Sequence, residues 1–285
     1  MVSLSKPYKA ILAGLIVTVL AVGQAGLAHA QTGTLLRNVH LPAFANHPIY
    51  FPVGVAFDGT NLWYSNPSTG PMDIFQISTT GTLLSTLNKQ AYAGALAWDG
   101  ANLWVAPFDA SAKKVELYLV SVGPHPQIVK EVDITSIILG NGSCAAISGL
   151  YYNLKKDTLW VTPNACVGPG ITNRNTSYLI DTSGNLLRTI SFSIPVAALT
   201  KVGDNFYVTN KGGYTTTGLQ AIVQTNEDGN VITSFGGADE RNEQTSYDPS
   251  TFAPDCALWT MHFFFNSTTN DLDGNLNAYE IPCAD

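Results

Sequence analysis

The sequence predicts an all-β protein, a five-bladed β-propeller of four-stranded antiparallel blades. The main observation is a short aromatic motif that returns five times, at residues 61–64, 102–105, 158–161, 205–208 and 257–260. The second residues of successive copies lie 41, 56, 47 and 52 residues apart, which is close to the length of a propeller blade and too long for leucine-rich or ankyrin repeats. Short strand-like runs separated by turn residues surround each motif, as in an antiparallel meander.

The first four copies predict complete blades. In blade 1 we expect strands at residues 53–59, 61–65, 73–77 and 82–87. In blade 2 we expect them at 94–100, 102–105, 115–122 and 127–134. Blade 3 is expected to run from 148–151 to 185–190, and blade 4 from residue 197 to 230–235.

The fifth copy has only three strands, which we expect around residues 245–247, 257–262 and 276–281. The missing outer strand is at the other end of the chain, because residues 33–39 (GTLLRNV) match the outer-strand segments 81–87 and 184–190. We therefore expect the N-terminal strand to complete the last blade. This closure removes a free sheet edge, which would otherwise favour aggregation.

Residues 1–30 are predicted to be a secretory signal peptide. Lys6 and Lys9 precede an apolar run over residues 10–22, and an Ala-His-Ala cleavage pattern follows. The run is too short to span a bilayer. We therefore expect residues 31–285 to form one domain that is secreted or periplasmic and is not inserted in a membrane.

The charge of the remaining chain excludes some partners. Without the signal peptide it has 12 basic residues against 21 acidic ones, a formal net charge of −9. So few cations offer no obvious patch for phosphates, which argues against a nucleic-acid partner, and an anionic membrane surface would repel the protein. The length suffices for a single large domain, which we expect to be a monomer.

Four cysteines allow three pairings. In a four-stranded meander, the end of the second strand lies beside the start of the first, and the start of the second lies beside the end of the third. In blade 3, Cys144 precedes the first strand and Cys166 follows the second, so the two should meet. In blade 5, Cys256 precedes the second strand and Cys283 follows the third, so they should meet as well. We therefore expect disulfides Cys144–Cys166 and Cys256–Cys283, each stabilising the fold by about 3 kcal/mol, rather than a zinc site.

The same geometry gathers the long connections on one face. These connections are residues 42–52, 135–147, 163–175, 210–218, 236–243 and 262–275. The opposite face is expected to carry tight turns such as Asp58-Gly59 and Asp99-Gly100. Function is usually found where loops are long, so the first face is the predicted site.

The candidate ligand-binding residues on that face come from all five blades: His47, Tyr50, Asn66, Asp109, Asn164, Lys211 and His262. Two histidines and an aspartate could serve general acid–base chemistry, although exposed loop residues are often only solvated. Residues 271–275 (DLDGN) have the acidic spacing of a calcium loop but lack its final glutamate. We interpret them as a polar turn.

Two segments carry a family resemblance. Residues 52–58 (PVGVAFD) resemble the opening of an NHL-type blade, and residues 206–210 (FYVTN) resemble a YVTN-type blade. Propellers with such blades include streptogramin-lyase-like and SMP-30/gluconolactonase-like proteins, so the resemblance implies a propeller over nearly the whole mature chain and is compatible with binding scaffolds, lyases and lactone hydrolases.

The lactonase-like relatives hold an axial metal with acidic or amide residues at the start of several inner strands. The corresponding residues here are Val53, Ala93, Ser148 and Val196, with an oxygen ligand only from Glu243 or Gln244 in the fifth blade. We therefore expect neither a metal site of that kind nor a cofactor.

The recurrent motif aromatics have a simpler explanation than ligand binding. A residue that returns at one place in every blade serves what all blades share, which is packing between sheets. We therefore expect side chains of this set to be buried between blades: Trp63, Trp104, Trp160, Tyr207 and Trp259.

Three functions stay open on the sequence alone. The favoured one is a rigid binding module for a protein, glycan or small ligand, because no nucleophile elbow, zinc-binding helix or phosphate-binding loop is found. The second is a metal-independent lyase or hydrolase that uses His262 and His47 near the channel mouth. The third is a structural component of a cell surface or matrix.

Overall fold

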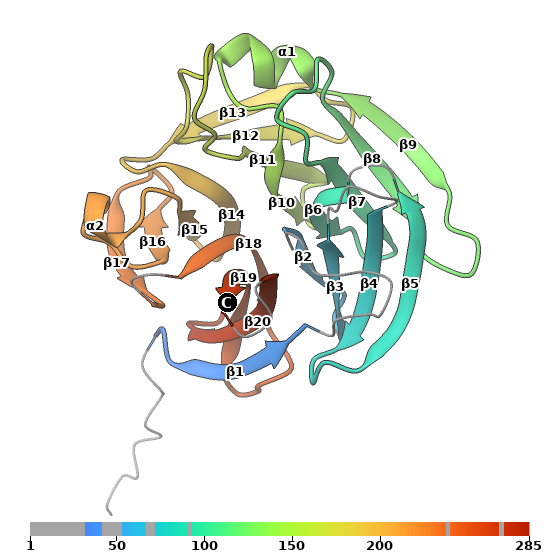
Figure 1. Cartoon of the computed structure of the whole chain (residues 1–285), viewed down its shortest axis with the longest axis vertical. Helices are drawn as coiled ribbons and strands as arrows, with labels where there is room; N and C mark the ends of the chain where they lie inside the picture. Colours follow the sequence, from blue (N-terminus) through green and yellow to red (C-terminus); the bar gives the residue numbers. More distant parts are fainter. Residues whose placement is uncertain are drawn as a thin grey trace, which may run out of the picture.

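The computed structural model has five four-stranded antiparallel sheets arranged in a ring around a common axis (Figure 1). It describes residues 32–41, 53–66, 72–90, 93–237, 240–267 and 271–284. The signal-peptide prediction lies outside these residues. The predicted five-bladed propeller is confirmed, and the innermost strand of each blade faces the axis.

The strands follow the order of the sequence, with one exception in the last blade. Blade 1 contains β2 (Val55–Phe57), β3 (Asn61–Asn66), β4 (Met72–Ser78) and β5 (Leu83–Gln90). Blade 2 contains β6 (Ala93–Trp98), β7 (Asn102–Pro107), β8 (Glu116–Ser121) and β9 (Ile128–Asp133). Blade 3 contains β10 (Ile147–Asn153), β11 (Thr158–Pro163), β12 (Thr176–Asp181) and β13 (Leu186–Ser191). Blade 4 contains β14 (Val196–Val202), β15 (Asn205–Asn210), β16 (Ile222–Asn226) and β17 (Val231–Phe235). Blade 5 contains β18 (Arg241–Asp248), β19 (Cys256–Asn266), β20 (Asp271–Ile281) and, outermost, β1 (Leu35–His40).

Blade 5 closes the ring as predicted. Strand β1 pairs antiparallel with β20, and further backbone hydrogen bonds extend the pairing at both ends. Gly33 N donates to Glu280 O at 2.8 Å, and Leu41 N donates to Gly274 O at 2.9 Å. Leu41 is fully buried. The N-terminal strand therefore covers the outer edge of β20 and packs into the core.

The hydrophobic core is divided among the five seams between neighbouring blades. Each seam contains one apolar cluster, and each cluster contains one of the motif aromatics. These five side chains are at most 3% exposed: Trp63, Trp104, Trp160, Tyr207 and Trp259. The prediction that they pack between blades is confirmed. Burial of such large apolar surfaces is the main stabilising contribution at each seam.

Small residues allow the inner strands to approach closely around the axis. A Cβ added at Gly149 would lie 2.5 Å from Ala198 Cα, and one added at Gly94 would lie 2.8 Å from Ile147 O. A larger side chain at either position would therefore clash with the next blade.

One long side chain crosses this narrow axis. Gln244 Oε1 accepts hydrogen bonds from Leu96 N at 2.8 Å and Val55 N at 3.3 Å. Its Nε2 donates to Leu150 O at 2.8 Å and to Leu96 O. A single amide from blade 5 therefore joins blades 1, 2 and 3.

Some predicted loops contain regular structure. The prediction of a loop over residues 262–275 is wrong. Strands β19 and β20 are paired along their whole length, from Cys256 with Ile281 to Asn266 with Asp271. The interpretation of residues 271–275 as a polar turn is wrong for the same reason. Three consecutive phenylalanines, Phe263 to Phe265, extend β19, and aromatic residues favour strands. Short helices α1 (Thr135–Ile138), η1 (Leu139–Asn141) and α2 (Tyr214–Thr217) lie in two other predicted loops.

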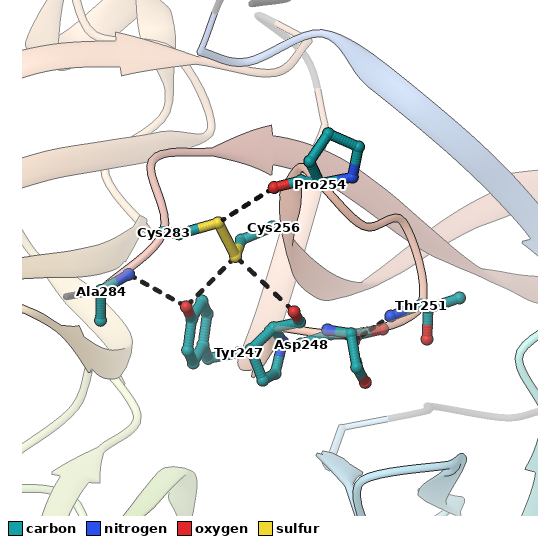
Figure 2. Close-up of a disulfide and its surroundings, with 9 residues drawn as sticks. Tyr247, Asp248, Thr251, Pro254, Cys256, Cys283 and Ala284 are labelled. Atoms are coloured by element: carbon teal, nitrogen blue, oxygen red, sulfur yellow. Dashed lines mark hydrogen bonds between the residues drawn. A yellow bond between two sulfur atoms is a disulfide. The ribbon is translucent and has the colours of Figure 1, made fainter.

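Both predicted disulfides are present. Cys144–Cys166 encloses a sequence separation of 22 residues and Cys256–Cys283 one of 27. The second joins the start of β19 to the segment after β20, so it holds the C-terminal segment on the tight-turn face. Figure 2 shows the Tyr247 hydroxyl between this bridge and the C-terminal segment. The hydroxyl lies 3.4 Å from Cys256 Sγ and accepts a hydrogen bond from Ala284 N at 3.1 Å.

Candidate functional site

The candidate site lies where the axis meets the face with the long connections. Inner strands begin at this face and second strands end there, so the start of β18 lies beside the ends of β15 and β19. The pairing of β18 with β19 is interrupted between Asn242 and Thr245. This bulge releases Glu243 and Gln244 from regular strand pairing.

Glu243 forms an ion pair with Lys211, which follows β15. The carboxylate is fully buried, whereas the lysine side chain is 18% exposed. Glu243 Oε1 contacts Lys211 Nζ, and no residue in the described segments supplies a hydrogen bond to the buried Oε2. The Glu243 main chain is held as well, because Thr209 Oγ1 donates to its carbonyl oxygen at 2.9 Å. The pair therefore presents a positioned carboxylate beneath a more accessible ammonium group.

Two cations lie near one aromatic ring beside this pair. Lys211 Nζ is 5.9 Å from the centre of the Phe263 ring, and Arg241 Cζ is 6.0 Å from it. Both distances allow a favourable cation–π interaction. The site thus combines a carboxylate and two cations that lie against a buried aromatic ring.

His262 lies against the same segment of β18. It pairs in register with Asn242, and its ring stacks on Phe264 with centroids 5.6 Å apart. Burial lowers the pKa of His262 from its ordinary value of 6.5, while the negative charge of Glu240 and a backbone hydrogen bond at Arg241 oppose this shift. A histidine with a lowered pKa is mostly neutral at neutral pH.

Glu240 has its own polar partners at the start of β18. The Tyr279 hydroxyl donates to Glu240 Oε2 at 2.8 Å, and Asn242 Nδ2 donates to the same oxygen at 3.3 Å. Burial, followed by the charge of Glu240, raises the pKa of Tyr279. Tyr279 therefore stays protonated and acts as a hydrogen-bond donor.

The other predicted residues are spread over the face. Asn66 is buried at the end of β3. Asp109 accepts from Ser111 N at 2.8 Å within its own loop, and Asn164 N donates to Ala146 O at 2.8 Å within blade 3. His47 and Tyr50 lie outside the described residues. Of the predicted set, Lys211 and His262 are the two that lie against the same segment of β18.

No metal cluster is found in the part of the chain that the structure describes, where no three His, Cys, Asp or Glu side chains are grouped closely enough to hold an ion. In the same residues, no helix is long and apolar enough to cross a membrane.

The sequence prediction considered Glu243 only as a metal ligand and missed its pairing with Lys211. A usable signal was present in the repeat. When the inner strands are aligned by the residue that pairs with the motif aromatic, the residues two and three positions earlier can be compared between blades. In blade 5 they are Glu243-Gln244, and in blades 1 to 4 they are Val53-Gly54, Gly94-Ala95, Ser148-Gly149 and Ala197-Ala198. Only the blade 5 pair has long polar side chains at the positions that line the axis.

No protein-family model matches the chain, and no curated protein is significantly similar to it. Solved structures share its fold. The glutaminyl cyclase of Myxococcus xanthus has a TM-score of 0.57 over 87% of this chain and 97% of that protein, at 11% identity. A tail fiber of Staphylococcus aureus phage P68 has a TM-score of 0.50, covering 86% of this chain and 52% of the fiber chain at 9% identity. Identities this low show the fold alone.

Proposed function

We propose that this protein is a secreted or periplasmic binding module that holds a small ligand or a peptide end at the axis, on the face with the long connections. The observation that carries the proposal is the buried Glu243 carboxylate, which has one oxygen engaged by Lys211 and the other without a hydrogen-bond partner among the described residues. An unsatisfied buried polar atom costs about 1–3 kcal/mol, and more when it is charged. A ligand that supplies the missing donor recovers this cost.

The chemistry of the pair indicates the class of ligand. Glu243 accepts hydrogen bonds and favours an ammonium or amide N–H, while Lys211 donates and favours a carbonyl or carboxylate oxygen. The buried Phe263 ring packs next to Lys211 and helps to hold its ammonium group in place. A free peptide N-terminus or an amino acid carries an adjacent donor and acceptor and matches this arrangement.

A second candidate function is catalytic and uses the same carboxylate. The Myxococcus xanthus neighbour is a glutaminyl cyclase, matched over 97% of its length. Cyclisation of an N-terminal glutamine requires the α-amine to attack the side-chain amide, form a lactam and release ammonia. Glu243 would accept the proton of the attacking amine and pass it to the departing ammonia, without a metal or cofactor. Blade motifs like those of NHL and YVTN propellers are compatible with either a binding or a catalytic use.

Calorimetric titration of a short peptide with a free N-terminal glutamine tests the proposal. We expect the free peptide to bind and the N-acetylated peptide to bind at least about tenfold more weakly, because acetylation removes the ammonium group. Glu243→Gln keeps the side-chain size and should weaken binding of the free peptide by a similar factor. Asp228→Ala, at an exposed turn on the opposite face, should leave binding unchanged.

Equal binding of the two peptides, or unchanged binding by a folded Glu243→Gln protein, would contradict the proposal. Mass analysis of the recovered peptide separates the two candidates, because a cyclase releases ammonia from the peptide and a binding module returns it intact.

A further inference from the structure

A second feature of the molecule lies away from the axis, in the seam between blades 1 and 2. A groove of about 610 Å³ opens there on the face with the tight turns. Its walls come from the β2–β3 turn, the middle of β4 and β5, the end of β6 and the β8–β9 turn. It is lined by Asp58, Trp63, Gln76, Ser85, Thr86, Leu87, Trp98, Val122, Gly123, Pro124 and Pro126. This volume is within the usual range of small-molecule sites, about 300–1,000 Å³.

Two stacked tryptophans form the aromatic part of the groove. The rings of Trp63 and Trp98 have centroids 6.5 Å apart and an interplanar angle of 11°. Trp63 is almost completely buried and is fixed by its indole N–H, which donates to Asp58 Oδ2 at 2.9 Å. Trp98 is partly exposed. The groove thus offers a supported indole surface whose position is set before any ligand arrives.

A chain of hydrogen bonds forms the polar part. Gln76 Nε2 donates to Asp58 Oδ2 at 2.9 Å, and the Ser85 hydroxyl donates to Gln76 Oε1 at 3.1 Å. Asp58 Oδ1 is also occupied, by Thr60 N at 3.0 Å and Asn61 N at 2.7 Å. The carboxylate is therefore saturated by four donors from the protein itself.

The groups left for a ligand are neutral. They are the second amide hydrogen of Gln76, the oxygen lone pairs of Ser85 and the indole N–H of Trp98, which donates to no residue in the described segments. Among the residues that the structure describes, no lysine, arginine or histidine lines the groove. The described lining therefore suits a ligand that donates and accepts hydrogen bonds, has an apolar face for the indole and needs no charged partner.

The equivalent place in blade 5 shows that this opening is not a property of every seam. There, Trp259 Nε1 donates a hydrogen bond to Asp248 Oδ2 at 2.9 Å, as Trp63 does to Asp58 in blade 1. That ring is fully buried, and Phe252 packs on it with centroids 5.9 Å apart. The protein fills the blade 5 position with its own phenylalanine, whereas the seam between blades 1 and 2 stays open.

We propose that this groove binds a neutral saccharide. One sugar ring stacks its C–H face on the Trp98 indole, and its hydroxyl groups bond to Gln76 and Ser85. Saccharide hydroxyls both donate and accept, as the free groups of the groove require. A proline-rich peptide also favours aromatic grooves, but its proline residues carry no N–H to donate to Ser85. The site is separate from the axis and does not depend on the function proposed above.

Titration of the full chain with neutral oligosaccharides, followed by tryptophan fluorescence and calorimetry, tests this proposal. The probes are the hexasaccharides of cellulose, xylan, maltose and chitin series, with a polyproline peptide as the alternative ligand. We expect at least one oligosaccharide to bind and to change the fluorescence. Trp98→Ala should weaken that binding at least tenfold, and Ser85→Ala should weaken it several-fold.

The variants and controls keep the outcome decisive. Ser85→Ala removes one hydroxyl from a partly exposed strand position, so it tests the site even if Trp98→Ala does not fold. Tyr214→Ala removes an exposed aromatic side chain on the other face and should leave binding unchanged, as should Glu243→Gln. Failure of every oligosaccharide to bind, binding of the polyproline peptide alone, or binding unaffected by Ser85→Ala and Trp98→Ala would overturn the proposal.

Discussion

At the scale of single residues, the Gln244 side chain links blade 5 to three other blades at the axis. Its amide satisfies backbone groups of Val55, Leu96 and Leu150, which belong to three different blades. These groups are buried and would lose a partner if the amide were removed. Each unsatisfied group costs about 1–3 kcal/mol, so one side chain contributes substantially to the joining of the blades.

We expect Gln244→Ala to lower the free energy of unfolding by about 3 kcal/mol, measured by urea denaturation. Gln127→Ala is the control, because Gln127 is exposed, and it should change the free energy by less than about 0.5 kcal/mol. If the Gln244→Ala protein were as stable as the wild type, the amide would not be what joins the blades at the axis.

His262 should make the stability depend on pH. Burial lowers its pKa, so the unfolded chain takes up a proton near the ordinary value of 6.5 while the folded protein does not. Stability is therefore fully present above that value and is lost as the pH falls toward the lowered pKa of the folded state. We expect the melting temperature of the wild type to drop more between about pH 7 and about pH 5 than that of His262→Gln. Equal drops in the two proteins would show that His262 does not contribute.

The sequence could predict where site residues stand but not always which groups they meet. Lys211 was found because it follows a second strand on the face with the long connections. Its partner Glu243 was missed because a bulge interrupts the alternation of side chains in β18, and the period-2 rule that assigns side chains to faces fails at a bulge. The direction of Glu243 follows from that local geometry.

At the scale of strands, most of the fold could be predicted from the sequence repeat. The recurrent aromatic motif and the strand-like runs around it predicted the five blades, and the match of residues 33–39 to other outer strands predicted the closure. The long β19–β20 hairpin was not predicted, because the other blades suggested a loop at that point. The helices α1 and α2 have four residues each, too few to show a helical period in the sequence.

The closing strand β1 should be required for stability. Deleting residues 31–41 removes the pairing with β20 and the buried side chains Val39 and Leu41, and it exposes an edge. We expect the melting temperature to fall by about 10 °C or more and light scattering to show aggregation, relative to a chain that begins at residue 31. A synthetic peptide of residues 32–41 should restore much of the stability. A truncated protein that stays monomeric with an unchanged melting temperature would refute the closure.

At the scale of the whole molecule, the two ends of the propeller differ in kind. The face with the long connections carries a charged cluster around Glu243 and Lys211, whereas the groove beside Trp98 on the opposite face offers neutral groups. Packing at the five seams holds both in place, because each seam is a continuous apolar cluster between rigid sheets. The two sites that we propose therefore lie on opposite faces and differ in chemistry.

The central claim is that the ligand site lies at the end of β18 nearest the axis. Hydrogen exchange tests it most directly, measured by mass spectrometry with and without a peptide that has a free N-terminal glutamine. The account predicts slower exchange on binding in segments that contain residues 209–212 and 240–244, because a ligand on Glu243 and Lys211 covers them and restricts their opening. Segments around residues 58–63 and 96–99, in the opposite face, should exchange at the same rate with and without the peptide. Protection confined to those opposite segments, or no change anywhere at saturating peptide, would contradict the account.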